Sequence, residues 1–434
     1  RAFLEQEDLV SIIFVSSLVA HQLSMESSAD QAGSKCAVVT TVRGVDAKEL
    51  RFFLTWHLHL GFEFIWVFFD FSEGAQGADE ETVRMIDELE FRGRVFKSFS
   101  NDELREEQRR ICRSWERLQA CLDEVPARQE LNADLAITRA MQAGARWILH
   151  LDSDELWFPY SSEDADVFSQ RMASSSNLVS QHFDGLERQG IGHITYQNVE
   201  AVPENLSVTN AFAEATLFKC HFTSLPLTHD AMVTLKEWTS KNKNGQFFVG
   251  YDNGKSAVRL LKGVTVRGVH SFHLPDDVDL KYSNYIVDVR SNRNFSRPPE
   301  PLMVDGCILH YISCGFQRWY KKYQSLGPFK DSWFNGKIKI GNCFHSESRE
   351  VVSQQTQDEA RAWYARQMIP SKSLVQKSIQ HGVCKRILSV RNYSQTLFQV
   401  PPEEENSLAE ENSNSDPTQE LNNQNECSET NTAT

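Results

Sequence analysis

The sequence lacks several features that mark common classes of protein. Its 434 residues contain no two cysteines spaced as CxxC, the pattern typical of structural zinc sites. No apolar run reaches the roughly 20 residues that a membrane-spanning helix needs. Lys and Arg (45) are outnumbered by Asp and Glu (59). Because nucleic-acid binders neutralise phosphates with clustered Lys and Arg, this balance argues against that class.

The acidic excess is concentrated at the C-terminal end. Residues 401–434 hold nine carboxylates and no Lys or Arg, which leaves residues 1–400 with 50 acidic and 45 basic side chains. The net charge of that larger part is therefore −5, against −14 for the whole chain. The tail is also rich in Asn and Ser and poor in apolar residues, so we expect 401–434 to be disordered.

The N-terminal 34 residues contain a short apolar segment and a polar linker. The run Leu9–Ala20 has two interpretations: the remnant of a signal peptide or membrane anchor, or a peripheral helix on the domain. The first would place the protein in the secretory pathway, in the Golgi or ER. The second leaves a cytoplasmic location open. The nine scattered cysteines do not decide between them.

Apolar strands alternate with amphipathic helices along the chain. The β-branched run Cys36–Val42 and the apolar run 64–69, which ends at Asp70, have the length and composition of buried strands. Between them, Asp46 and Glu49 form a capping-box pattern that predicts a helix ending at Gly61. Further strands are predicted at 95–99, 147–151, 192–198, 215–220, 257–260 and 264–269, and helices at 79–92, 102–122, 127–143, 313–326 and 355–369, with a surface excursion at 160–190. This alternation predicts an α/β fold with a mainly parallel sheet between helices.

Two carboxylates follow the predicted strand 147–151. Side chains two residues apart on an extended chain share a face, so Asp152 and Asp154 point the same way. They repel each other unless a cation lies between them or one of them is protonated. Such oxygen ligands suit Mn²⁺ or Mg²⁺, and the carboxyl ends of parallel strands form the ligand crevice of α/β sheets. The sequence therefore predicts a site for a divalent metal and phosphate here; a surface turn capped by Asp is the alternative.

In the order and spacing of these segments, residues 36–325 resemble a GT-A glycosyltransferase of the family 2-like group, near glycosyltransferase family 92. The resemblance rests on Cys36–Val42; Glu49, Trp56, His57 and Gly61; 69–72; 129–132; 147–155; 255–259; 269–271; and His310 with Tyr311. The chain departs from the family pattern at Arg43-Gly44, where relatives often have Asn-Glu, and after Ser72, where many have a second Asp.

The resemblance implies a three-layer α/β/α catalytic domain of the GT-A type at 35–330, followed by a helical extension at 331–400. It implies transfer of a sugar from a nucleotide diphosphate sugar, a UDP- or GDP-sugar, to a glycan, protein or lipid hydroxyl, with inversion at the sugar. Mn²⁺ or Mg²⁺ would bridge the diphosphate as a Lewis acid.

The resemblance also implies roles for individual residues. Asp154 would bind the metal directly, and Asp152 would bind the metal, the ribose or both. His270 would add a later metal ligand, with His310 as second choice; for both, a structural histidine is the alternative.

Five further residues would meet the donor. Lys255 would neutralise the diphosphate, with Arg259 on the same strand, and Asp70 would face the base or ribose. Gln129 and Asn132, on one helical turn, would approach the donor. An ordinary surface strand is the alternative for the first two, and polar core packing for the last two.

An inverting enzyme also needs a carboxylate that takes the proton of the acceptor hydroxyl. Asp230 and Asp252 are the candidates, with Asp276 as a further contender, and no pattern ranks them. The aromatic residues Trp319, Tyr320 and Tyr323 either stack on an acceptor sugar or form a core stripe at helical spacing.

Two other functions remain open. His150, Asp152 and Asp154 alternate on one strand face and could form the cluster of a metal-dependent phosphohydrolase. A catalytically inactive, sugar-binding relative is the other reading, although the intact acidic segment argues against it.

Overall fold

The structure, a computed structural model, describes residues 33–70, 80–88, 91–159, 178–284, 306–341 and 343–397. The predicted apolar segment Leu9–Ala20 and the predicted disordered tail 401–434 lie outside this part of the chain. Residues up to Ser394 form one unit, distinct from a second unit that begins at Gln395. Within the described ranges, no helix is both long and apolar enough to cross a bilayer.

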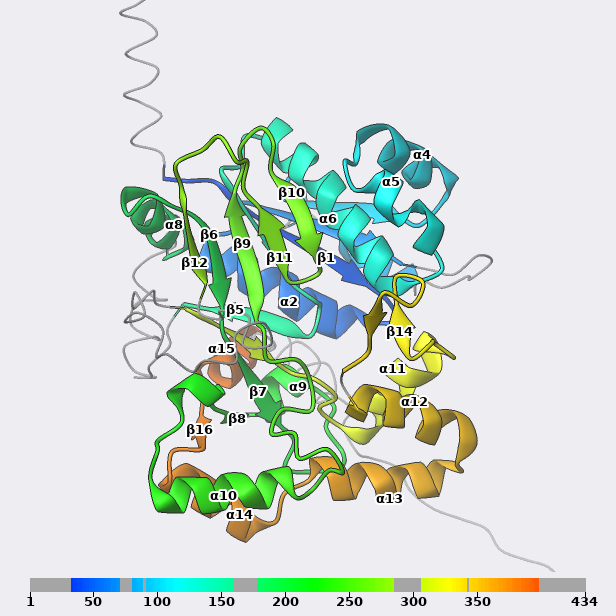
Figure 1. Cartoon of the computed structure of the whole chain (residues 1–434), viewed down its shortest axis with the longest axis vertical. Helices are drawn as coiled ribbons and strands as arrows, with labels where there is room; N and C mark the ends of the chain where they lie inside the picture. The colour runs from blue at the N-terminus through cyan, green and yellow to red at the C-terminus, as the bar shows by residue number, and fades with distance from the viewer. Residues whose placement is uncertain are drawn as a thin grey trace, which may run out of the picture. The chain divides into compact units, whose positions relative to one another are not determined.

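A seven-stranded sheet forms the centre of the first unit (Figure 1). Its strands, in spatial order, are β12 (Lys281–Asn284), β6 (Ile191–Tyr196), β9 (Lys255–Arg259), β4 (Trp147–His150), β1 (Cys36–Val42), β2 (Phe64–Phe69) and β3 (Val95–Phe99). Four of the six neighbouring pairs are parallel, and β9 runs antiparallel to both of its neighbours. The predicted α/β fold with a mainly parallel central sheet is confirmed.

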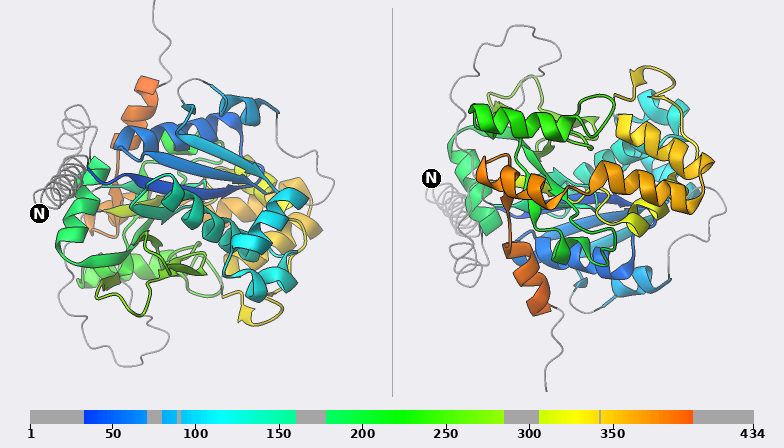
Figure 2. Two further views of the ribbon diagram at one scale, coloured as in Figure 1. Left: turned by 90° about the horizontal axis from the view of Figure 1, so that it is seen from above. Right: turned by 90° about the horizontal axis from the view of Figure 1, so that it is seen from below.

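Helices cover both faces of this sheet (Figure 2). On one face, α6 (Val125–Gln142) packs Leu131 and Leu135 into a core with Val39 and Ile148. On the other face, Trp147, which alternates with Ile148 along β4, packs against a phenylalanine of α8 (Leu178–Arg188) with ring centroids 4.9 Å apart. The alternating residues of the strands are apolar on both sides, as a doubly covered sheet requires.

A second sheet continues from the acidic turn. Its five strands, in spatial order, are β16 (Cys384–Arg386), β8 (Leu217–Lys219), β7 (Asn198–Val202), β13 (Cys307–His310) and β5 (Glu155–Phe158). Helix α2 (Ala47–Leu60) packs on β5, where Trp56 Nε1 donates to Trp157 O at 3.0 Å and Trp157 N donates to His57 Nε2 at 3.2 Å. The turn between β4 and β5 therefore lies where the chain passes from one sheet to the other.

The remaining elements are short strand pairs and peripheral helices. The strand pairs are β10 (Thr265–Gly268) with β11 (Ser271–His273), and β14 (Ser332–Trp333) with β15 (Ile338–Lys339). The helices are α3 (Glu80–Met85), α9 (Ala211–Glu214), η3 (Phe222–Ser224), α10 (His229–Thr239), α11 (Phe316–Leu326), α12 (Cys343–Gln354), α13 (Gln357–Met368), α14 (Lys372–Gln380) and α15 (Ser389–Leu397). Trp319 and Tyr323 of α11 are buried in a core with Trp363 and Tyr364 of α13, as the core-stripe alternative expects, and Tyr323 also lines the cavity described below.

Three sequence predictions of secondary structure differ from the structure. The helix predicted at 79–92 is shorter, since α3 spans Glu80–Met85. The helix predicted at 102–122 is divided into α4 (Asp102–Ile111), α5 (Trp115–Leu118) and η2 (Gln119–Cys121). The cause is a tertiary contact, because Asp134 of α6 accepts hydrogen bonds from Ser114 N and Oγ at 2.8 and 2.5 Å. The surface excursion predicted at 160–190 contains helix α8. The high content of Ser and Asp in this segment hid the buried face of that helix from the sequence prediction.

Candidate active site

The carboxyl ends of β1 and β4 open into a cavity of about 2220 Å³. Its wall includes the segment Asp152–Asp154, the start of α6, the loop 246–253, and residues of α11 and β15. A single small-molecule site typically occupies about 300–1,000 Å³. The cavity therefore has room for more than one small molecule.

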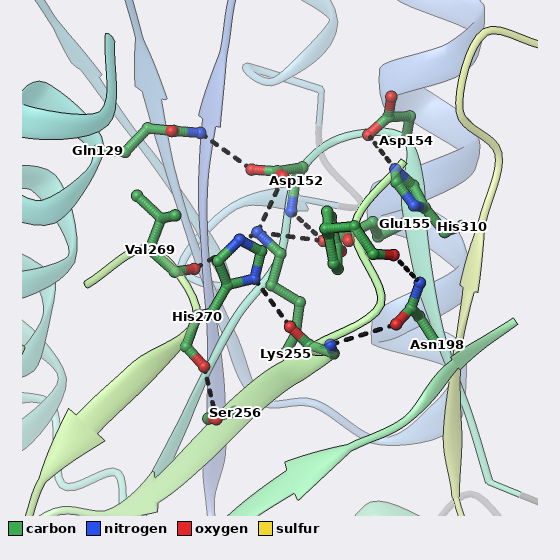
Figure 3. Close-up of polar contacts among 12 residues, drawn as sticks. Gln129, Asp152, Asp154, Glu155, Asn198, Lys255, Ser256, Val269, His270 and His310 are labelled. Carbon is green, nitrogen blue, oxygen red and sulfur yellow. Dashed lines mark hydrogen bonds and ion pairs between the residues drawn. The ribbon is translucent and has the colours of Figure 1, made fainter. Parts of the chain in front are cut away.

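Asp152 lies between two donors at the cavity floor (Figure 3). Its Oδ1 accepts from Gln129 Nε2 at 2.9 Å, and its Oδ2 is 2.8 Å from Lys255 Nζ. Burial opposes ionisation, but the Lys255 ammonium outweighs it and holds the pKa of Asp152 below its ordinary value. Gln129 lines the cavity beside Asp152, and its approach to a donor stays a prediction.

Lys255 is fully buried beneath the turn rather than in the cavity wall. Besides Asp152, its Nζ lies 3.5 Å from Glu155 Oε2 and 3.4 Å from Val269 O. Glu155 in turn accepts from Asp152 N at 2.7 Å. Burial raises the pKa of Glu155 well above its ordinary value, and Lys255 only partly offsets this. Lys255 therefore fixes the acidic turn from below, and its donors are directed at the protein.

Asp154 points away from Asp152 towards different partners. Its Oδ2 accepts from Lys322 Nζ of α11 at 3.0 Å. Its Oδ1 lies 4.0 Å from His310 Nε2, a contact drawn in Figure 3. The antiparallel pairing of β13 with β5 places His310 opposite Glu155 and so beside Asp154. Burial opposes ionisation of Asp154, but Lys322 and His310 hold its pKa well below the ordinary range. Asp152 and Asp154 are thus each neutralised by a separate lysine.

His270 has the electronic state that a metal ligand requires. Its Nδ1–H donates to Gly254 O at 2.8 Å, which leaves the lone pair of Nε2 available. Burial, and next the charge of Lys255, lower the pKa of His270 to about 3, so the ring is neutral at physiological pH. Nevertheless, no three His, Cys, Asp or Glu side chains of the described ranges lie close enough together to hold an ion. The residues present do not fit the predicted Mn²⁺ or Mg²⁺ site, since ammonium groups already contact both carboxylates.

The lack of a three-ligand cluster in the described ranges also bears on the hypothesis of a metal-dependent phosphohydrolase. His150 is buried on β4 and does not line the cavity. His150, Asp152 and Asp154 therefore form no ligand cluster in the part of the chain that the structure describes.

Asp70 does not line the cavity where the donor base was expected to meet it. It is buried at the end of β2, and its two oxygens accept from Arg128 Nε and Nη2 at 2.6 and 2.7 Å. Arg43 Nη1 approaches the same carboxylate at 3.7 Å. Both carboxylate oxygens thus contact Arg128, and Arg43, which lines the cavity, connects this ion pair to it.

Asn132 and Arg259 also lie away from the cavity. Asn132 is buried between helices and sheet, where it donates to Thr41 Oγ1 at 3.0 Å and accepts from a glutamine of α4 at 2.8 Å. Arg259 is at the far end of β9, paired with Glu187 at 3.5 Å. Because β9 runs antiparallel to β4, the first residue of β9 lies beside the acidic turn that follows β4. Its last residue, Arg259, lies beside the start of β4, at the other end of the strands.

The structure separates the candidates for the catalytic carboxylate. Asp252, in the loop before β9, lines the cavity. Asp230 is exposed in the first turn of α10, and Asp276 is exposed in the connection after β11; neither belongs to the cavity wall.

Sequence reasoning missed the basic face of α11. Arg318 and Lys322 are four residues apart and both line the cavity. Arg318 Nη1 pairs with Glu49 Oε1 of α2 at 3.0 Å. The spacing of these two cations, next to the aromatic residues of the same helix, is the sequence signal that indicates this basic face.

Two curated proteins of Arabidopsis thaliana, both named glycosyltransferase-like, are similar to this chain. One is 25% identical over 379 residues, which cover 84% of this chain and 72% of its own length. The other is 26% identical over 275 residues, which cover 62% of this chain and 45% of its own length. No model of a protein family matches the chain. The two similarities support a glycosyltransferase in general terms, and name no donor or acceptor.

Solved structures give weaker similarities. The apo crystal structure of mouse xyloside xylosyltransferase 1 aligns at 13% identity with 53% of this chain and 67% of its own, with a TM-score of 0.21. Apo UDP-glucose pyrophosphorylase aligns at 8% identity with 44% of this chain and 68% of its own, with a TM-score of 0.19. TM-scores this low do not establish a shared fold.

Proposed function

We propose that this protein is a glycosyltransferase that moves a sugar from a nucleotide diphosphate sugar to a hydroxyl group of an acceptor. The observation that carries the proposal is the position of the segment Asp152–Asp154, at the carboxyl end of β4, in the wall of a cavity of about 2220 Å³. The similarity to two proteins named glycosyltransferase-like supports the same class. A UDP- or GDP-sugar donor, a glycan, protein or lipid acceptor, and a place in the Golgi or ER belong to the proposal.

The chemistry requires one bond to form as another breaks. The acceptor oxygen bonds to C1 of the sugar, and the bond from C1 to the phosphate oxygen breaks, with the electron pair leaving on the diphosphate. The proton of the acceptor hydroxyl passes to a carboxylate. We assign this proton to Asp252, because it is the sequence candidate that lines the cavity. Attack from the face opposite the diphosphate would invert the configuration at C1.

The test is release of a nucleoside diphosphate from a panel of UDP- and GDP-sugars, measured both in EDTA and in MnCl₂, with a simple phosphate ester as comparison. Release from any nucleotide sugar, with the ester untouched, supports the proposal. Hydrolysis of the ester without release from nucleotide sugars would instead indicate a phosphohydrolase. Binding of a nucleotide sugar with no turnover would indicate an inactive, sugar-binding protein.

A further inference from the structure

Helix α11 contributes three basic side chains to the cavity wall beside Asp154. Arg318, Lys321 and Lys322 all line the cavity. Arg318 is paired with Glu49, and Lys322 with Asp154, both at 3.0 Å. Lys321 is exposed and adds a third cation next to these two pairs. An anion that enters the cavity here meets these three basic side chains beside the carboxylates of Asp46, Glu49 and Asp154.

Lys322 is better placed to bind a phosphate than the sequence candidate Lys255. The Lys255 side chain has no exposed surface, and its ammonium is surrounded by Asp152, Glu155 and a backbone carbonyl. The Lys322 side chain is 37% exposed in the cavity wall, and among the described residues its one hydrogen bond is to Asp154. An ammonium group has three N–H donors. Lys322 therefore has the donor capacity and the access that Lys255 lacks.

The contact with Asp154 gives this lysine a fixed position and a fixed charge. Asp154 Oδ2 lies 3.0 Å from Lys322 Nζ, so the carboxylate that was predicted to hold a divalent ion holds an ammonium ion instead. A second cation against the same oxygen would be repelled by the first.

We infer that Lys322 supplies the positive charge that binds the diphosphate of the donor, so that nucleotide binding needs no divalent ion. The inference rests on the proposed function, and it gives Asp154 the task of orienting Lys322. When the bond from C1 to the phosphate oxygen breaks, the charge left on the diphosphate would be met by this ammonium group and its neighbours on α11.

The test measures the Kd of UDP and of GDP by calorimetry, in EDTA and in MnCl₂, for the full chain and three variants. Lys322→Ala removes the proposed cation. Lys236→Ala, at an exposed lysine of α10 outside the cavity, controls for the loss of one charge. Asp154→Asn keeps the shape of the side chain but removes its charge. Thermal unfolding establishes that each variant is folded.

We expect the unaltered chain to bind one of the nucleotides with the same Kd in EDTA and in MnCl₂. Lys322→Ala should weaken that binding about tenfold or more, the effect of losing one charged hydrogen bond, and Lys236→Ala should not. Asp154→Asn should still bind in EDTA, because Lys322 remains. If Lys322→Ala does not fold, the binding of nucleotide to Asp154→Asn in EDTA and in MnCl₂ still tests the inference.

Binding that requires Mn²⁺ and is lost in Asp154→Asn would overturn the inference and restore Asp154 as a metal ligand, while leaving the proposed function intact. Failure of both nucleotides to bind under either condition would overturn the proposed function together with the inference.

Discussion

Glu200 of β7 and Lys219 of β8 form a buried ion pair, with 2.7 Å between Oε1 and Nζ. The same carboxylate accepts from the backbone N–H groups of Val249 and Gly250 at 3.0 and 2.7 Å, and Lys219 donates to Phe247 O at 2.6 Å. The pair therefore fixes the loop that brings Asp252 to the cavity and leads into β9.

Breaking this pair should cost much more stability than breaking an exposed one. We expect Glu200→Ala to lower the free energy of unfolding by about 3–5 kcal/mol, because it removes the carboxylate that pairs with a buried ammonium and accepts from two loop N–H groups. The matched control is Glu237→Ala, which removes a half-exposed pair with Lys377 and should cost less than about 1 kcal/mol. Urea denaturation measures both. Equal, small losses would show that the buried pair does not fix the loop.

Breaking the buried ion pair between Asp70 and Arg128 should also lower the stability of the fold, and the nucleotide binding of the same variant tests whether Asp70 contacts the donor. Asp70→Asn should lower the free energy of unfolding by about 3–5 kcal/mol, since Arg128 is buried and would lose its bidentate partner. Asp87→Asn, in an exposed pair with Lys97, should cost less than about 1 kcal/mol. If Asp70→Asn kept full stability but bound nucleotide weakly, Asp70 would have the donor contact that the sequence predicted.

The choice between Asp252 and Asp230 can be tested directly. With a donor and acceptor in hand, we expect Asp252→Asn to slow transfer about 10²–10⁴-fold, the usual contribution of a general base, without changing the Kd of the nucleotide. Asp230→Asn should transfer at the original rate, because Asp230 is exposed on α10 outside the cavity. Steady-state rates and calorimetry give the two quantities. The reverse pattern would move the base to Asp230.

Local sequence signals predicted the elements that depend on local interactions. The strand Cys36–Val42 has the bounds that its β-branched run predicted. Asp46 caps α2 by accepting from Glu49 N at 2.8 Å, and Gly61 ends it in the left-handed conformation with φ of 106°. Each of these features is decided within a few residues of chain. The acidic turn after β4 was found for the same reason, since strand and carboxylates are adjacent in sequence.

The partners of the site residues could not be predicted in this way, because they come from distant segments. Lys322 lies 168 positions beyond Asp154, and Arg128 lies 58 positions beyond Asp70. The separate fates of Lys255 and Arg259 follow from the antiparallel direction of β9, and nothing in the five residues of that strand specifies its direction. Long-range packing, rather than any motif, decides which charges meet.

Buried His57 should make the stability of the fold depend on pH. Burial lowers the pKa of His57 to about 3, although a hydrogen bond to Phe53 O partly opposes this. The unfolded chain takes up a proton below the ordinary pKa of about 6.5, and the folded chain does not, so stability is lost as pH falls from about 6.5 towards 3. This one group contributes a slope of up to about 1.4 kcal/mol per pH unit.

We expect His57→Gln to be less stable than the unaltered chain at neutral pH, with the difference shrinking as the pH falls to about 4. His229→Gln, at an exposed position at the start of α10, is the control for replacing a histidine outside the core. Urea denaturation at a series of pH values measures both. A constant difference for His57→Gln would show that this ring is not held neutral by the fold.

Gly254, the residue before Lys255, should tolerate no side chain. Its φ is +68°, and a Cβ would lie 1.9 Å from Tyr196 O, a backbone atom of the neighbouring strand that cannot move without breaking the sheet. Gly144 has a similar φ of +79° but open space around it, so it separates backbone strain from collision. Gly144→Ala should cost about 1–2 kcal/mol from the left-handed conformation alone. Gly254→Ala should cost more than about 4 kcal/mol and release the His270 ring, whose Nδ1–H donates to Gly254 O. Urea denaturation of both variants measures the difference, and equal losses would mean that β6 and the loop before β9 are not packed as closely as the structure places them.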